Sequence, residues 1–409
     1  MIIRRIKPEE LKRTGELFSI AFEFPEDNSK SAMEVYEETI KDQSSRDNIY
    51  WQDRYAAFED DDKTMMSFFV AKPYPVHFDG NHCTMTGIGG VATLPQYRRR
   101  GGIRGCFELS LKDMYESGYE FSYLYPFSTA YYRKFGYELC VEKMQYKLML
   151  SFIPQYNVDG YCELAEPDNI HLDDIRTIHE NWQVRYNMMV ENEDCDYLWL
   201  KNTNPVKDQV YTYLYKNKNG TPKGYLCFKN EDSPEGRILN CSRFVYTDLE
   251  GLKGLLNLAR SYSSDHMFIR FALPTDQYIT CLLPEWSLGA GSCDRALGGM
   301  ARVVHVEKVL NKARYIGDGE IRIAVTDPYI KENTGTFHVI FNNGVATSVT
   351  KDDSSTADIS LHITDFSRLI IGCLETEQIS FLENVTVNTD MNTLSKVFYK
   401  KPVMLTEYF

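Results

Sequence analysis

The sequence predicts a protein of the α/β (α+β) class with more than one domain, and three observations lead to that prediction. The chain has 409 residues, which is enough for about two to three domains of roughly 150 residues each. Strand and helix patterns alternate over residues 1–150, and a similar order recurs over residues 160–285. Beyond residue 300, several strand patterns precede two helical ones, which is typical of a smaller α+β region.

The first region begins with an expected strand at residues 2–6 and a helix that starts near Pro8, since proline favours the first helical position. Three apolar, partly alternating runs then predict an antiparallel meander, at residues 54–58, 65–76 and 83–94. The clearest helix of the chain ends at Gly118 and has one small or apolar face from Ile103 onward. The region closes with a strand, a short helix and a strand, at residues 121–125, 129–134 and 144–150.

The second region repeats this order but has no basic glycine turn. It is expected to begin with a helix at residues 172–186 and a hairpin of two strands at residues 210–215 and 224–228. A strand at residues 238–246, a helix at residues 249–260 and a strand at residues 267–272 are expected to follow. The hairpin is expected to turn at Asn219-Gly220, and Asp248 is expected to cap the second helix. We interpret this region as a second copy of the first fold.

The third region follows a segment rich in Gly and Ala at residues 288–300, which is interpreted as a linker. Four strands are expected, at residues 302–310, 321–325, 336–341 and 345–349. Two helices are expected after them, at residues 363–371 and 391–398. The predicted domains are therefore residues 1–150, 151–287 and 288–409.

Charge and composition exclude several classes of function. Asp and Glu outnumber Lys and Arg by 58 to 45, so with a formal charge of −13 neither nucleic acid nor an anionic membrane surface is expected as the main partner. A cationic substrate is favoured instead. The 10 cysteines and 8 histidines lack metal-binding spacing, which predicts reduced thiols and no metal. The absence of a secretion signal or of an apolar run of about 18 residues predicts a cytoplasmic protein that does not span a membrane.

Residues 87–104 carry the most informative motif, GIGGVATLPQYRRRGGIR. A strand runs into a tight basic glycine turn, and the turn opens an amphipathic helix whose unpaired N–H groups and dipole favour a pyrophosphate. Four arginines add formal charge: Arg98, Arg99, Arg100 and Arg104. No G-x-x-x-x-G-K-[ST] is present and no G-x-G-x-x-G follows a strand here, which argues against the two common nucleotide folds. A glycine turn with a solvated basic patch is the alternative.

This strand, turn and helix are followed at residues 130–138 by AYYRKFGYE, and together they resemble the GNAT superfamily of acetyl-CoA-dependent N-acetyltransferases. The full-length layout resembles the Eis (enhanced intracellular survival) type of aminoglycoside acetyltransferase. That resemblance implies two tandem GNAT-like mixed-sheet domains, the second without the cofactor loop, and then a sterol-carrier-protein-like α+β domain. The family pattern R-x-x-G-x-[GA] is met at Arg98 and Gly101, whereas Ile103 replaces the second small residue.

The resemblance also implies which residues bind acetyl-CoA. Backbone groups of Val91 and Thr93 would hold the pantetheine arm and the acetyl carbonyl, and residues 98–104 would bind the pyrophosphate. Ser128 would border the cofactor, although its hydroxyl serves equally well as the N-cap of the next helix. The implied cofactor-binding set is Val91, Ala92, Thr93, Arg98, Arg99, Arg100, Gly101, Gly102, Ile103, Arg104 and Ser128.

In enzymes of this type a neutral amine attacks the thioester directly, so the protein removes a proton from an ammonium and returns one to the thiolate. The resemblance assigns the general acid to Tyr132, three residues before Phe135. Tyr131 is the rival, and packing in the core is the alternative role for Tyr132. The resemblance assigns the base to the C-terminal carboxylate of Phe409, for which a frayed terminus is the alternative.

We therefore expect an N-acetyltransferase that acts on an aminoglycoside-like or polyamine-like small molecule, with protein lysine as another acceptor. The loop at residues 22–27 offers carboxylates beside aromatic rings for such a cation. The alternative is a lipid-binding or structural assembly protein with a vestigial GNAT domain, because apolar residues of the third region either line a lipid cavity or fill a core. The resemblance further implies a homo-oligomer, namely a hexamer.

Overall fold

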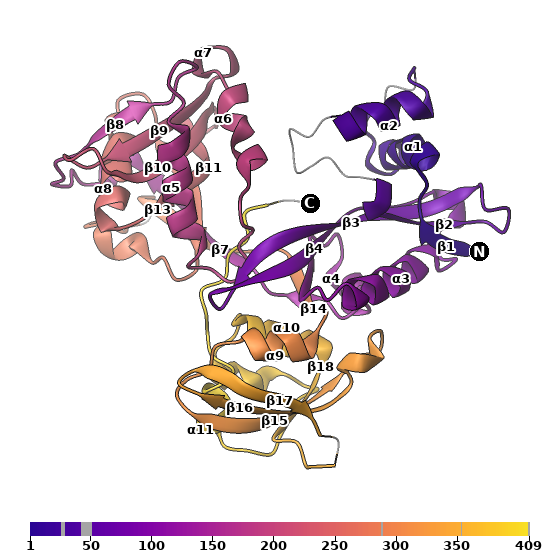
Figure 1. The fold of residues 1–409 in the computed structure, drawn as a ribbon. Coiled ribbons are helices and arrows are strands. Elements are labelled where there is room, and N and C mark those ends of the chain that lie inside the picture. Colours follow the sequence, from indigo (N-terminus) through magenta and orange to yellow (C-terminus); the bar gives the residue numbers. More distant parts are fainter. Residues whose placement is uncertain (26–28, 42–50, 288, 353, 408–409) are drawn as a thin grey trace. The chain divides into compact units, whose positions relative to one another are not determined.

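The computed structural model describes residues 1–25, 29–41, 51–287, 289–352 and 354–407 (Figure 1). Contacts between residues divide the chain into two compact units. The first unit contains Met1–Val141, Gly298–Lys401 and the residues from Leu405 onward, and the second contains Glu142–Leu297 and Pro402–Met404. No helix in these described ranges is long and apolar enough to cross a membrane.

The first unit has a mixed sheet of seven described strands. In spatial order they are β1 (Ile2–Arg5), β2 (Arg54–Phe58), β3 (Met65–Phe78), β4 (Asn81–Thr93), β5 (Phe121–Leu124), β14 (Met300–Val303) and β6 (Glu138–Leu139). Strands β1 to β4 are antiparallel neighbours, which confirms the predicted meander, and β5 lies parallel to β4. A parallel pair needs a crossover, and helix α3 (Gly102–Glu116) provides it.

Helices cover both faces of this sheet (Figure 1). The other helices near it are α1 (Leu11–Phe22), α2 (Ala32–Lys41) and α4 (Thr129–Arg133). α3 buries Phe107 and Leu111 in a core that includes Ala57 of β2. α1 buries Leu11 in a separate core with Ala56, the preceding strand residue. Since successive strand residues point to opposite faces, α1 and α3 lie on opposite sides of the sheet.

The second unit repeats the arrangement with its own sheet of seven described strands. Their spatial order is β13 (Gly291–Leu297), β7 (Glu142–Met149), β12 (Phe268–Pro274), β11 (Ile238–Tyr246), β10 (Pro222–Glu231), β9 (Val210–Lys216) and β8 (Tyr161–Leu164). The helices are α5 (Leu172–Gln183), α6 (Leu198–Asn202), α7 (Pro205–Asp208) and α8 (Leu249–Ser261). The predicted hairpin is the antiparallel pair β9 and β10, and β11 pairs with β12 in parallel across α8.

The segment at residues 288–300 is not a linker, so that prediction is wrong. It contains β13, which pairs with β7 from Gly291 opposite Leu148 to Leu297 opposite Glu142. β7, which the sequence pattern assigns to the first region, therefore belongs to the second sheet, where its Tyr146 is fully buried. The domain boundaries at residues 150 and 287 stay a prediction.

The prediction of a strand at residues 302–310 is also wrong, except for residues 302 and 303. β14 ends at Val303, where it pairs with Phe121 of β5 in the first sheet. Helix α9 (Val306–Lys312) follows at once. Val306, Val309 and Leu310 are all buried and recur at helical spacing, which is the pattern that the strand prediction overlooked.

The remaining residues form a five-stranded described sheet. Its order is β17 (Val345–Lys351), β16 (Gly335–Asn342), β15 (Gly319–Thr326), β18 (Ile359–His362) and β19 (Thr386–Val387), with helices α10 (Ile363–Ile371) and α11 (Met391–Ser395). The strands predicted at residues 336–341 and 345–349 form the antiparallel pair β16 and β17, and both predicted helices are confirmed. α10 is the better-buried helix, with Phe366 and Leu369 fully inaccessible.

Candidate active site

Strands β4 and β5 separate in the middle of the first sheet, next to a bulge in β4. Their parallel pairing ends at Ile88 opposite Leu124. In the described part of the chain, β4 continues to Thr93 paired only with β3. The register with β3 shifts beside Gly90, which has a φ of 60°. Along residues 89–93, the edge of β4 that faces away from β3 is therefore not paired with β5, and its backbone N–H and C=O groups are available to a ligand.

The expected pantetheine-binding residues lie on this unpaired edge. Val91 packs against the core beneath α3, whereas Ala92 belongs to the core beneath α1. Their side chains therefore occupy opposite faces of the sheet. The backbone is the part of both residues that remains available to a ligand along the edge.

The turn before α3 contains two residues in the left-handed conformation, Arg99 with a φ of 66° and Gly101 with a φ of 89°. Gly101 is the N-cap of α3 and has no side chain that could accept a hydrogen bond. Among the described residues, the first N–H groups of α3 therefore lack a side-chain cap. Together with the helix dipole, they make this helix start suitable for an anion.

Four exposed arginines surround the start of α3: Arg98, Arg99, Arg100 and Arg104. Arg100 lies 3.6 Å from the carboxylate of Glu59, and its guanidinium lies 5.1 Å from the ring centre of Tyr97. Within the described ranges the other three arginines form no ion pair, so their charge is available to phosphate oxygens.

The two residues after Gly101 have packing roles as well. A Cβ on Gly102 would lie 2.5 Å from the Oγ of Ser67 and 3.0 Å from the Cβ of Ala57, so glycine allows α3 to approach the sheet closely. Ile103 is only 7% exposed and belongs to the core beneath α3. Gly102 has no side chain and the Ile103 side chain packs in the core, so only the backbone N–H groups of these two residues are left for a ligand at the turn.

The second unit has the corresponding helix, but an acidic cap occupies its start. α8 follows β11 as α3 follows β4, and Asp248 is its N-cap. The Asp248 carboxylate accepts a hydrogen bond from the N–H of Gly251 at 2.9 Å and pairs with Lys223 at 2.6 Å. Because a carboxylate uses these N–H groups and repels phosphate, this helix start agrees with the expected lack of a cofactor loop.

Tyr132 lies in α4, just beyond the end of β5. Its side chain is 2% exposed, and its ring packs edge-on against Phe107 and Tyr131, at 6.1 and 5.2 Å between ring centres. Burial raises the pKa of Tyr132 above its usual value, so the phenol keeps its proton at neutral pH. Its hydroxyl has no hydrogen-bond partner among the residues that the structure describes.

Tyr131 and Ser128 behave differently from Tyr132. Burial also raises the pKa of Tyr131. This side chain is only half-buried, however, and the charge of nearby Arg104 offsets part of the rise. The Ser128 hydroxyl accepts a hydrogen bond from the N–H of Tyr131 at 3.3 Å and caps α4. The N-cap role that the sequence offered as an alternative for Ser128 is thus present.

The C-terminal segment contacts the end of β5. Tyr125, the residue after β5, donates a hydrogen bond to the backbone carbonyl of Glu407 at 2.8 Å. Earlier in the segment, Lys401 forms a buried ion pair with Asp79 at 2.5 Å. Phe409, the expected base, lies outside the described residues, as do residues 26 and 27 of the expected acceptor loop.

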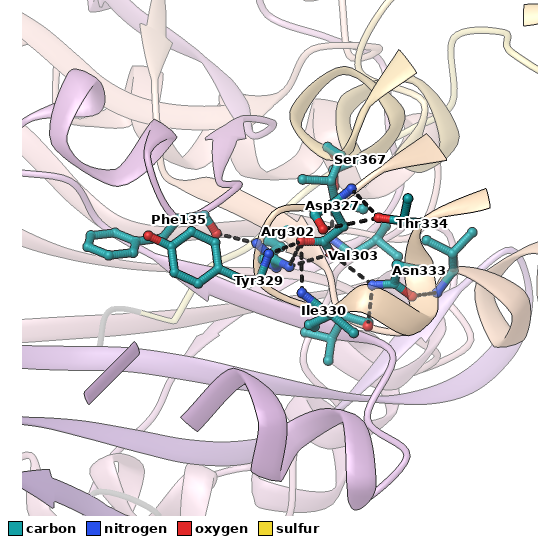
Figure 2. A network of polar contacts seen from close by, with 12 residues as sticks. Phe135, Arg302, Val303, Asp327, Tyr329, Ile330, Asn333, Thr334 and Ser367 are labelled. Atoms are coloured by element: carbon teal, nitrogen blue, oxygen red, sulfur yellow. Dashed lines mark hydrogen bonds and ion pairs between the residues drawn. The ribbon is translucent and has the colours of Figure 1, made fainter. Parts of the chain in front are cut away.

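Figure 2 shows a buried polar network that the sequence does not predict. Arg302 of β14 is completely buried and pairs with Asp327, with its Nη2 at 2.7 and 2.5 Å from the two carboxylate oxygens. Its Nη1 donates a hydrogen bond to the backbone carbonyl of Phe135, in the turn after α4. The available signal was a single charged residue inside the apolar run MARVV at residues 300–304.

Three family models match separate parts of the chain. Residues 2–140 match an acetyltransferase (GNAT) domain, and residues 195–303 match a second acetyltransferase (GNAT) domain. Residues 306–406 match a sterol carrier protein domain. No curated protein matches the sequence at a significant level.

Solved structures with the same fold cover the whole chain. A probable N-acyltransferase of unknown function from Enterococcus faecalis is 23% identical, with a TM-score of 0.82 over 100% of this chain and 99% of that one. A GCN5-related N-acetyltransferase from Anabaena variabilis is 19% identical, with a TM-score of 0.83 over 100% of both chains. Eis1 from Mycobacterium abscessus is 16% identical, with a TM-score of 0.79 over 100% of both chains.

These matches confirm the expected mixed α/β architecture with two GNAT domains and a sterol carrier protein domain. They agree with the site, because GNAT domains use acetyl-CoA as the acetyl donor and the start of α3 suits its pyrophosphate. At these identities the solved structures establish a shared fold. The chain is thus an acetyltransferase of the GNAT type, with the same full-length fold as Eis1.

Proposed function

We propose that this enzyme transfers the acetyl group of acetyl-CoA to an amine of a cationic small molecule, either aminoglycoside-like or polyamine-like. One observation carries the proposal. The open backbone edge of β4 leads, through the short connection at residues 94–101, to the uncapped start of α3, which exposed arginines surround. A long anionic thioester needs this combination, because its arm can pair with backbone groups while its pyrophosphate meets N–H groups and cations.

The residues present fit acetyl-CoA, which supplies the acetyl group as an activated thioester. In the proposal, backbone groups of Val91 and Thr93 hold the arm and the acetyl carbonyl. The N–H groups of Gly102 and Ile103 bind the pyrophosphate together with the side chains of Arg98, Arg99, Arg100 and Arg104. Ser128 borders the cofactor while it caps α4.

Tyr132 is the proposed general acid, which donates its proton to the departing thiolate. Its burial supports this role, because a phenol with a raised pKa stays protonated until negative charge develops beside it. Burial raises the pKa of Tyr131 as well, but nearby Arg104 offsets part of that rise, so Tyr131 suits the role less well.

The C-terminal carboxylate of Phe409 is the proposed base. The hydrogen bond from Tyr125 to Glu407 supports this role, because a chain of two further residues reaches at most about 7 Å beyond that contact. An α-carboxylate with a pKa of about 3.5 is a weak base in water, so desolvation or a relay through water is part of the proposal.

The acceptor is proposed to be a polyamine-like or aminoglycoside-like cation because the chain has a formal charge of −13. Protein lysine is the competing class of acceptor. A panel of both classes, assayed for CoA release, distinguishes them. Turnover only with lysine peptides would remove the small-molecule proposal.

The catalytic assignment is tested with Tyr132→Phe and its neighbour Tyr131→Phe as the matched control. Acetyl-CoA should raise the melting temperature of both variants and of the natural protein. Only Tyr132→Phe should lose turnover, and unchanged turnover in this variant would remove the acid role. No stabilisation by acetyl-CoA far above micromolar concentration would favour a lipid-binding or structural protein with a vestigial site.

We further propose that the enzyme acts in the cytoplasm as a homo-oligomer, specifically a hexamer. The family resemblance supports this assembly. Sedimentation of the full chain measures it directly, and a monomer at micromolar concentration would exclude it.

A further inference from the structure

The network in Figure 2 joins parts of the first unit that lie far apart in the sequence. Asp327 follows β15, within the residues that match the sterol carrier protein domain, and is 3% exposed. Besides Arg302, its carboxylate accepts hydrogen bonds from the N–H groups of Tyr329 and Ile330 at 3.0 and 3.1 Å, and from the Asn333 amide at 2.9 Å. The carboxylate is therefore fixed from several directions.

Arg302 connects this carboxylate to the turn after α4. Its Nη2 binds Asp327, and its Nη1 donates to the backbone carbonyl of Phe135. Because a guanidinium is planar and presents its donors as a rigid fork, fixing one nitrogen on the carboxylate fixes the direction of the other. Gly136 has a φ of 85°, and a Cβ at this position would clash with the Nη1 of Arg302.

The Phe135 carbonyl belongs to the same turn as Tyr132. The N–H groups of Phe135 and Tyr137 both donate to the backbone carbonyl of Tyr132, at 2.9 and 3.4 Å. The Phe135 ring stacks on Phe107 at 4.2 Å between ring centres, and the Tyr132 ring packs edge-on against the same Phe107. The Phe135 carbonyl that Arg302 binds is thus part of the turn that carries Tyr132, and the two aromatic rings pack on the same Phe107.

We propose that Arg302 and Asp327 are positioning residues for acetyl transfer. Asp327 orients Arg302, and Arg302 holds the Phe135 carbonyl so that the phenol of Tyr132 stays in the orientation for proton donation. This inference rests on the proposed function of Tyr132. It gives the sterol carrier protein domain a part in the reaction that requires no bound lipid.

The test is a double-mutant cycle between Arg302→Lys and Tyr132→Phe. Lysine keeps the positive charge beside Asp327 but lacks the planar fork that reaches two acceptors at once. We expect Arg302→Lys to lower kcat about 10- to 100-fold, because a small displacement of a reacting group costs that much. The KM for acetyl-CoA should stay within about twofold, since the cofactor contacts are unchanged.

In the Tyr132→Phe background, Arg302→Lys should cause no further loss of kcat, because no phenol proton remains to be positioned. Fully additive losses would overturn the positioning role. Tyr132→Phe alone separates the two proposals. If its kcat is unchanged, the acid assignment itself fails; if its kcat falls while Arg302→Lys remains fully active, only the positioning role fails.

Arg133→Lys is the matched control, since Arg133 also lies in α4 and its exposed guanidinium also pairs with a buried carboxylate, that of Glu138, at 2.8 and 2.9 Å. It should keep the natural kcat, and an equal loss would mean general loosening of α4 and would overturn the proposal. If Arg302→Lys does not fold, Asp327→Asn enters the same cycle, because its amide oxygen still accepts from Tyr329 and Ile330.

Discussion

The hydroxyl of Tyr125 donates a hydrogen bond to the backbone carbonyl of Glu407 over 2.8 Å, although 282 positions separate the two residues in the sequence. Tyr125 follows β5 directly, where that strand has parted from β4. The contact therefore places Glu407 next to the end of β5, in the sheet where acetyl transfer is proposed.

A short glycine-serine extension after Phe409 should abolish turnover, because it moves the free carboxylate away from the position that the Tyr125 contact supports. Binding of acetyl-CoA, measured as a rise in melting temperature, should persist. The same extension placed before Met1 is the control and should leave kcat unchanged. Full activity of the C-terminally extended protein would exclude the tail carboxylate as the base.

Replacing Arg99 by Gln should weaken acetyl-CoA binding about tenfold or more, because a hydrogen bond to a charged group contributes about 1.5–3 kcal/mol. We expect a higher KM for acetyl-CoA and little change in kcat at saturation. Lys112→Gln is the matched control, since Lys112 is an exposed cation within α3, the helix that follows Arg99, and pairs with Glu116 at 3.7 Å. Equal KM values for the two variants would contradict the assignment of the pyrophosphate site.

Gly102→Ala should destabilise the first unit by about 1–3 kcal/mol, because the added Cβ would lie 2.5 Å from the Oγ of Ser67. Ser67→Ala removes that Oγ and should recover part of the loss in the double variant. Thermal unfolding of the four proteins measures the coupling. Independent, additive effects would mean that the helix does not approach the sheet this closely.

The buried His179 should make the second unit sensitive to acid. Burial lowers its pKa to about 4, with a further contribution from Arg243, so the folded state keeps His179 neutral while the unfolded state protonates near pH 6.5. The unfolded state then binds more protons between pH 4 and pH 6.5. The contribution of His179 to the free energy of unfolding is therefore complete above pH 6.5 and decreases as the pH falls. By pH 5 about 2 kcal/mol of this contribution is lost.

His179→Gln should reduce the difference in unfolding free energy between pH 7.5 and pH 5. Trp182 lies 5.7 Å from His179 between ring centres, so tryptophan fluorescence during denaturation in urea is a local probe. His338→Gln is the control, because His338 pairs with Glu320 at the surface. An unchanged pH dependence in His179→Gln would show that other groups cause the acid sensitivity.

The parts of the fold that were predicted correctly depend on neighbours in the sequence. The turn and helix from Arg98 onward are indicated by glycine, charge and helical spacing, and the structure confirms them. Asp248 likewise caps α8 as its position before an apolar helix predicts. The cofactor-binding and catalytic roles in the first domain came from the family resemblance and stay predictions.

The errors concern pairings that no local pattern encodes. β14 looks like the start of a longer strand in sequence, yet its partner Leu124 lies in a segment far upstream. The same holds for Arg302, whose burial depends on Asp327 and on the Phe135 carbonyl. Such contacts depend on how distant segments meet, so the sequence reveals only an unexplained charge among apolar residues.

The insertion of β14 between β5 and β6 also constrains how the protein is made. Roughly 160 residues separate β6 from β14, and a ribosome adding about 5–20 residues per second needs on the order of 10–30 s to produce them. All residues of β5 are buried in the finished sheet. While the second sheet is being synthesised, the apolar edge strand β5 therefore still lacks its neighbour β14.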